Sequence, residues 1–178
     1  MNFKYIIAGL LVFVASTNAY ADEKKNEISA FLYANKTITP SGQDPIAILY
    51  GSYGRYFGRF ALTVSANVTK TGGFDMVGAG VGGKYYFKAG QKGDFVPFLA
   101  AEIQLNVGSG TSMDLYGYNI AGGGGVSIFI TETASLDGRL VYQTGSTTST
   151  IYGGPGGYTD STYSTTSALL TLGLTQRF

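Results

Sequence analysis

The feature that most constrains the fold of this chain is an alternation of apolar and polar side chains with a period of two residues. In the clearest run, residues 59–70, Phe60, Leu62 and Val64 alternate with Ala61, Thr63 and Ser65. This pattern is typical of strands whose two faces meet different surroundings. Eight extended segments are expected, at residues 27–37, 46–57, 59–70, 76–87, 95–107, 115–130, 134–143 and 163–178. In the first two, alternation alone does not tell the inward face from the outward one.

The chain begins with the features of an export signal. Lys4 provides a positive charge, residues 5–15 form an apolar run, and Ala19 and Ala21 supply the small-x-small pattern of a cleavage site. The apolar run is shorter than the ~20 residues that a membrane-spanning helix needs. We expect residues 1–21 to be a cleaved signal peptide and residues 22–178 to form one domain. No later segment is apolar enough for a spanning helix, so entry into a membrane would require strands.

The connections between the expected strands favour a barrel. Short turns, such as residues 57–58 and 131–133, alternate with longer connections, of which residues 145–162 are the longest. An even number of strands joined in this way is typical of outer-membrane proteins. We therefore predict an all-β fold, an eight-stranded antiparallel transmembrane β-barrel with up-and-down meander order.

The charged side chains indicate which face of each strand meets lipid. A Lys or Arg on the lipid face costs about 2–4 kcal/mol at the midplane, whereas a hydrated lumen tolerates it. We expect a lumen cluster of charged residues on the polar faces: Lys84, Glu102, Asp137, Arg139 and Arg177. Aromatic residues at strand ends are expected to form interfacial girdles: Tyr56, Phe57, Phe60, Tyr85, Tyr86, Phe87, Phe95, Phe98, Tyr116, Tyr118 and Phe129. The alternative is a soluble lipocalin-like barrel with its apolar faces turned inward.

Three segments carry a resemblance to a known family. Phe178, preceded at alternate positions by Leu174 and Leu172, is similar to the end of small bacterial outer-membrane barrels, although Gln176 departs from the apolar alternation. Residues 123–142 and 96–98 resemble a glycine-rich strand with its tight turn and a strand opening of the same proteins. Residues 22–178 thus resemble the small eight-stranded outer-membrane β-barrel family that includes the OmpA transmembrane domain and OmpX.

The resemblance implies a place in the outer membrane of a Gram-negative bacterium. It implies contact with outer-membrane lipid and lipopolysaccharide, and with periplasmic chaperones during export. It also implies that the barrel-assembly machinery reads Phe178, Leu174 and Leu172.

The composition excludes several chemistries. The sequence contains no His and no Cys, which excludes Ser-His-Asp and thiol catalysis and the usual zinc ligands. Its 12 basic and 11 acidic residues give no electrostatic footprint for nucleic acid. Residues 78–83 match a dinucleotide-binding pattern, but the chain continues there as a strand rather than a helix. We therefore expect that the protein is not an enzyme and that it has no cofactor and no metal site. A lipid-modifying barrel enzyme, the enzymatic alternative, would depend on His.

The expected function is non-enzymatic: envelope integrity with surface recognition or adhesion through extracellular loops. Residues 145–162 are rich in Ser, Thr, Gly and Tyr, a composition that suits a binding surface for a host or surface ligand. The candidate binding residues are Tyr152, Tyr158, Asp160 and Tyr163. The alternative for this segment is a hydrophilic cap without a partner. The charged side chains of the lumen cluster either form a gate or make a structural ion-pair network that fills the narrow barrel. The alternative function is a narrow channel or carrier for small or hydrophobic solutes, in the manner of a porin.

Overall fold

The computed structural model describes residues 25–35, 46–70, 74–110, 112–152 and 157–178. Ala19, Ala21 and the rest of the expected signal peptide lie outside these residues. The described residues form eight strands: β1 (Asn26–Asn35), β2 (Ile46–Phe57), β3 (Phe60–Lys70), β4 (Phe74–Tyr86), β5 (Phe95–Gly110), β6 (Met113–Phe129), β7 (Ala134–Tyr152) and β8 (Tyr158–Arg177).

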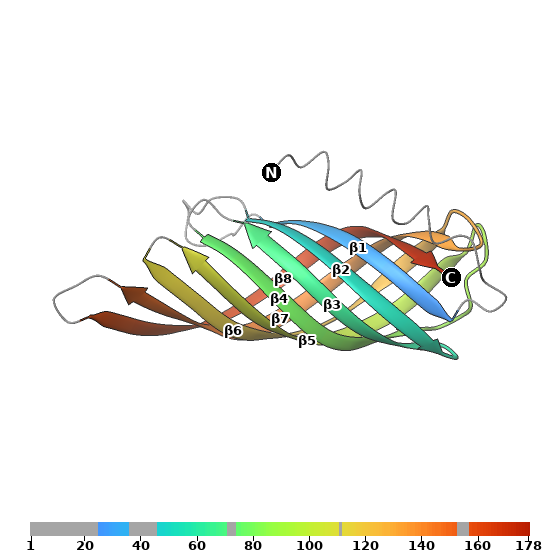
Figure 1. Cartoon of the computed structure of the whole chain (residues 1–178). Coiled ribbons are helices and arrows are strands. Elements are labelled where there is room, and N and C mark those ends of the chain that lie inside the picture. The colour runs from blue at the N-terminus through green and yellow to red at the C-terminus, as the bar shows by residue number, and fades with distance from the viewer. Residues whose placement is uncertain (1–24, 36–45, 71–73, 111, 153–156) are drawn as a thin grey trace.

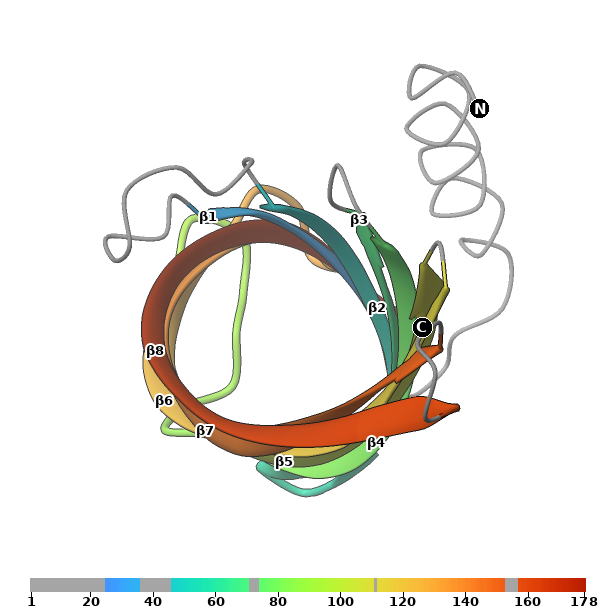
Figure 2. The same ribbon diagram turned by 90° about the vertical axis from the view of Figure 1, so that its left-hand side faces the viewer.

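The strands form a closed barrel (Figures 1 and 2) in which each pairs with its neighbours in the sequence and β1 pairs with β8. All eight pairings are antiparallel. The predicted fold class, an eight-stranded antiparallel meander barrel, is therefore confirmed. In the described part of the chain, no helix is long and apolar enough to cross a membrane.

The two faces of the barrel wall differ sharply in chemistry. Along β3, buried residues alternate strictly with exposed ones, and the exposed set includes Phe60, Leu62, Val64 and Val68. The same alternation runs around the barrel and leaves an outward apolar band. Its members on the other strands include Leu32, Val77, Val81, Leu99, Ile103, Leu105, Val107, Ile120, Leu140, Leu170 and Leu172. An apolar surface this extensive is typical of a surface that contacts lipid or a partner.

The structure resolves the faces of the first two strands. Glu27, Ser29 and Phe31 of β1 are buried inside the barrel, as is Tyr50 of β2. Leu32 of β1 is exposed on the outside. Alternation was ambiguous here because β1 places a charge, a small hydroxyl and an aromatic ring on the same inward face.

Four of the aromatic residues expected in the girdles lie elsewhere. Tyr56, Tyr86, Phe98 and Phe129 point inward, where the last three pack with buried Val96 and Tyr56 packs against them. Neighbouring residues of a strand must point to opposite faces, so each of the pairs Tyr56-Phe57 and Tyr85-Tyr86 has one ring inside and one outside. The outward rings do form girdles at both ends: Tyr53, Phe57, Phe60, Tyr85, Phe87 and Phe95 at one, and Tyr116 and Tyr118 at the other.

The prediction of a long loop at residues 145–162 is wrong, because most of these residues belong to β7 and β8. β7 and β8 are 19 and 20 residues long, and their hairpin reaches beyond the other strands (Figure 1). Two hydroxyl pairs join the two strands on the outer face, Thr144 with Thr166 at 3.2 Å and Thr148 with Thr162 at 3.0 Å. On the same face, the Thr150 hydroxyl donates to Asp160 Oδ1 at 2.7 Å. Thr and Tyr favour strands, and paired hydroxyls stabilise such a ladder.

Among the described residues, the seam between β1 and β8 is the shortest ladder of the barrel. It runs from the pair Glu27–Arg177 to the pair Leu32–Leu172. β7 and β8, by contrast, pair along the whole length from Ala134–Gln176 to Tyr152–Tyr158.

Candidate functional site

The lumen is closed near one end by a buried ion pair. Lys84 Nζ on β4 lies 2.7 Å from Glu27 Oε1 on β1, and the two side chains are 4% and 0% exposed. Lys84 also donates to Ser29 Oγ at 3.0 Å. Tyr86 donates to Glu27 Oε2 at 2.9 Å, and Tyr56 donates to the same oxygen. Both oxygens of the carboxylate are therefore satisfied, as a buried charge requires.

Two further carboxylates in the lumen are held by hydroxyl and amide groups. Glu102 accepts hydrogen bonds from Tyr50 at 2.7 Å, from Gln104 Nε2 at 2.9 Å and from Ser65. Asp137 accepts from Ser135 at 2.8 Å and from Thr175 at 2.6 Å. Glu102 on β5 is therefore held across the lumen by groups of β2 and β3 and by its own strand, whereas Asp137 on β7 is held by its own strand and by β8.

The two arginines stack on aromatic rings. The guanidinium carbon of Arg139 lies 4.1 Å from the ring centroid of Phe31, and that of Arg177 lies 4.4 Å from the ring of Phe129 and 4.7 Å from that of Tyr86. Such cation–π contacts suit arginine inside a narrow barrel. All five charged residues of the predicted lumen cluster thus lie inside the barrel.

Sequence reasoning missed Glu27, the partner of Lys84. It also missed the inward tyrosines Tyr50, Tyr56 and Tyr86, which hold the carboxylates. A buried lysine needs an acidic partner, so Lys84 itself indicates that an acid lies nearby. The sequence does not show which face of β1 points inward, and so it does not identify Glu27 as that acid.

The aromatic cluster and the β4–β5 connection complete the closure. Gly93 N–H donates to Phe129 O at 2.8 Å, and Phe129 N–H donates to Asp94 O at 3.0 Å. Gly125 of β6 leaves room for this packing, since a Cβ there would lie 2.6 Å from Phe98 Cζ. In the connection, a hydrogen bond from Lys88 and one from the Gln91 N–H hold the pKa of Asp94 below its usual value. We call this closed end of the lumen the floor. It consists of the Glu27–Lys84 pair and the cluster of Tyr86, Val96, Phe98 and Phe129.

A cavity of about 740 Å³ lies above the floor, within the range of small-molecule sites. One wall carries amide side chains: Asn67, Gln104, Asn106, Asn119 and Gln143. Asn67 Nδ2 donates to Gln104 Oε1 at 3.1 Å. Ile48, Tyr50 and Leu169 line the cavity from β2 and β8 and pack in one cluster with Phe31 of β1. The cavity lining therefore combines amide and hydroxyl groups with a small apolar patch.

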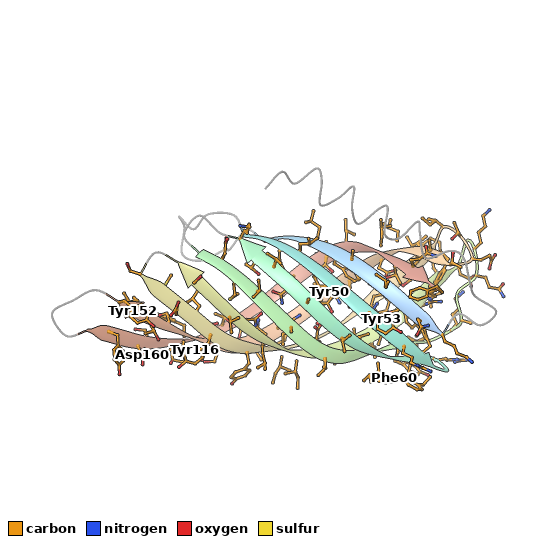
Figure 3. The ribbon with its side chains drawn as sticks, viewed as in Figure 1. Tyr50, Tyr53, Phe60, Tyr116, Tyr152 and Asp160 are labelled. Carbon is orange, nitrogen blue, oxygen red and sulfur yellow. The ribbon has the colours of Figure 1, made fainter. Side chains whose placement is uncertain are left out.

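The candidate binding residues lie on the β7–β8 hairpin, and Figure 3 shows Tyr152 and Asp160 near its tip. Tyr152 pairs with Tyr158, and Asp160 follows on the same face in register with Thr150. Tyr152 donates to Asp114 Oδ2 at 3.0 Å, whereas Tyr158 is 69% exposed. Tyr163 is exposed too but has the opposite parity on β8, so the structure brings three of the four residues to one face.

The proposed assembly residues lie along the final strand. Leu172 and Leu174 face outward on β8. Phe178 exchanges two backbone hydrogen bonds with Asn26, at 2.9 and 3.0 Å, and its ring centroid lies 6.5 Å from that of Tyr53. The end of the chain is thus tied into the barrel seam, and its reading by an assembly machinery stays a prediction.

In the described residues, no group of three or more His, Cys, Asp or Glu is placed to hold a metal ion. The arrangement instead offers two surfaces for binding: the cavity inside the barrel and the hairpin tip outside it.

No protein-family model matches the sequence, and no curated protein sequence matches it. Solved structures do match the fold. The chain is similar to Neisserial surface protein A (NspA), at 18% identity over 86% of this chain and 95% of that one, with a TM-score of 0.53. It is similar to the N-terminal β-barrel domain of OprF from Pseudomonas aeruginosa, at 16% identity over 88% and 98%, with a TM-score of 0.55.

The outer membrane protein OprG from Pseudomonas aeruginosa matches at 13% identity over 88% of this chain and 97% of that one, with a TM-score of 0.63. At these identities the likeness shows the fold. The chain thus has the fold of small eight-stranded outer-membrane barrels, as its sequence resemblance implied.

Proposed function

We propose that this chain is a non-enzymatic barrel of the outer membrane of a Gram-negative bacterium, contributing to envelope integrity and presenting the β7–β8 hairpin for recognition or adhesion. The outward apolar band and its two aromatic girdles support contact with outer-membrane lipid. The partners implied by this location are lipopolysaccharide around the barrel, and periplasmic chaperones and the barrel-assembly machinery during export.

The hairpin is the observation that carries the recognition role. Tyr118 of the upper girdle, at the hairpin end of the barrel, pairs with Ser146 of β7. β7 continues from Ser146 to Tyr152, a further ~20 Å of strand at ~3.3 Å per residue. The part above the girdle carries hydroxyl pairs rather than apolar side chains. Exposed Tyr152 and Tyr158 at its tip combine large contact area with few rotatable bonds, which suits a binding surface.

Shortening the hairpin tests this role. Joining Ser146 to Ser164, which are paired across the two strands, through an Asn-Gly turn removes the tip and keeps the girdle and barrel wall. We expect cells with the shortened protein to lose adhesion to host-cell monolayers and to retain the detergent resistance of cells with the full chain. The matched control is Tyr158→Ser with Tyr152→Ser, which keeps the hairpin length. Equal adhesion by cells with full-length and shortened protein would contradict the recognition role.

A solute pathway is the second candidate, and the cavity is the observation that favours it. The floor argues against passage along the whole barrel axis, because the Glu27–Lys84 pair and the Phe98 and Phe129 rings fill the lumen below the cavity. We expect the purified barrel to be silent in planar bilayer recordings. Discrete channels of constant conductance, abolished by filling the cavity with Ala121→Phe, would favour the channel instead.

A further inference from the structure

Two exposed arginines lie in the aromatic girdle at the floor end of the barrel. Arg55 is on the outward face of β2 between Tyr53 and Phe57, which are 42% and 61% exposed. Successive outward residues of a strand are about 6.6 Å apart, so Arg55 lies at the depth of the girdle. Arg59 belongs to the short turn before β3, and Figure 3 shows Phe60, the first residue of β3, at the end opposite the hairpin.

The neighbouring strands offer these two cations no exposed acidic side chain. In the described parts of β1 to β4 and the turns between them, the acids are Glu27 and Asp75. Glu27 is buried in the floor, and Asp75 lies at the opposite end of the barrel. Arg59 Nη1 donates to the backbone oxygen of Phe87 at 3.0 Å. The guanidinium of Arg55 forms no hydrogen bond or ion pair with the described residues.

The girdle at the hairpin end has different electrostatic surroundings. Tyr116 is 55% exposed on the outward face of β6, and Asp114 lies two residues away on the same face. Residues 112–118 of this strand and the paired hairpin residues 144–152 and 158–166 contain no lysine or arginine. Lipid head groups would therefore meet arginines at the floor end and an aspartate beside Tyr116.

Arginine at head-group depth is suited to a phosphate, because its guanidinium offers parallel N–H donors that match phosphate oxygens. Leu62, which pairs with Arg55 and is 55% exposed, continues the surface into the apolar band. We propose that Arg55 and Arg59 bind the phosphate of an anionic phospholipid in the periplasmic leaflet, with an acyl chain lying beside Leu62. This inference rests on the proposed membrane location, but not on the recognition role of the hairpin.

A tryptophan reporter tests the proposal, since the sequence contains no native tryptophan. Phe57→Trp places an indole beside Arg55, and Tyr116→Trp places one in the other girdle. Each variant is reconstituted in vesicles of phosphatidylcholine and phosphatidylglycerol in which one of the two lipids carries brominated acyl chains, which quench tryptophan on contact. We expect roughly fivefold preference for phosphatidylglycerol at Phe57→Trp, because basic side chains attract anionic lipid, and no preference at Tyr116→Trp.

Three controls make the result specific to the arginines. Arg55→Gln with Arg59→Gln in the Phe57→Trp background is expected to abolish the preference. Lys70→Gln removes an exposed cation at the other end of the barrel and should leave the preference intact. About 1 M NaCl should weaken it, because salt screens exposed charges. Folding of each variant is checked by its compact mobility in unheated detergent gels.

Equal quenching of Phe57→Trp by the two brominated lipids would overturn the proposal and leave the membrane location intact. A preference that survives the loss of both arginines, or an equal preference at Tyr116→Trp, would also overturn it. If neither brominated lipid quenched either tryptophan, the proposal would fall together with the membrane location.

Discussion

Glu27→Gln is expected to destabilise the barrel by about 3–5 kcal/mol, because it leaves the Lys84 ammonium buried without its counter-charge. Lys84 is 4% exposed and lies 2.7 Å from Glu27, so water cannot replace the lost partner. The free energy of unfolding is measured by urea titration of the protein in lipid vesicles.

The exposed pair Lys70–Asp75 is the matched control. Its N–O distance is also 2.7 Å, but its side chains are 60% and 62% exposed. Asp75→Asn is expected to cost only about 0–1 kcal/mol. The double variant Glu27→Gln with Lys84→Met should be more stable than the sum of the single changes predicts, since neither charge of the pair is then left buried without the other. A loss for Glu27→Gln no larger than that for Asp75→Asn would contradict the structural role of the buried pair.

Ile103→Arg is expected to destabilise the barrel in vesicles by about 2–4 kcal/mol, the cost of a guanidinium near the bilayer midplane. Ile103 is 53% exposed, pairs with Val81 and Ile120, and lies midway along β5 between the two girdles. In a soluble protein the same exposed position would accept an arginine at little cost. The measured cost of Ile103→Arg therefore shows whether the outward face of the barrel contacts lipid or water.

Thr162→Arg provides the comparison on the same outer face above the girdle. It is expected to change stability by no more than about 0.5 kcal/mol, as for an ordinary surface substitution. Unfolding of both variants is followed in the same vesicles. If Ile103→Arg were as well tolerated as Thr162→Arg, the outward band would not be in contact with lipid.

The sequence predicted the fold wherever the two faces of a strand meet different surroundings. Along β3, lipid-facing Leu62 and Val64 alternate with lumen-facing Thr63 and Ser65, so the pattern and the structure agree. The same contrast placed Lys84, Asp137 and Arg139 inside the barrel. Where the contrast disappears, the prediction fails. Above the girdle both faces of the β7–β8 hairpin are mostly polar, and residues 145–152 and 158–166 carry no apolar alternation.

For some strands, the alternation of apolar and polar residues does not show which side chains point into the lumen. The clustering of aromatic residues such as Tyr85 and Tyr86 at a strand end predicts that both lie in a girdle. However, consecutive residues of a strand point to opposite faces, so one of the two rings must point inward. Glu27 lies on a strand whose faces the sequence left open, so its pairing with Lys84 was out of reach. The cavity depends on strand register, which no local pattern in this chain encodes.

Labelling of single cysteines in intact cells tests most directly whether the barrel spans the outer membrane with its hairpin outside. Thr162→Cys lies on the hairpin and Lys92→Cys on the connection at the opposite end, in a chain without native cysteine. A membrane-impermeant maleimide is expected to label Thr162→Cys in intact cells, and Lys92→Cys only after the outer membrane is permeabilised. Protection of both sites in intact cells, with the protein recovered in the soluble periplasmic fraction, would contradict the membrane-spanning barrel.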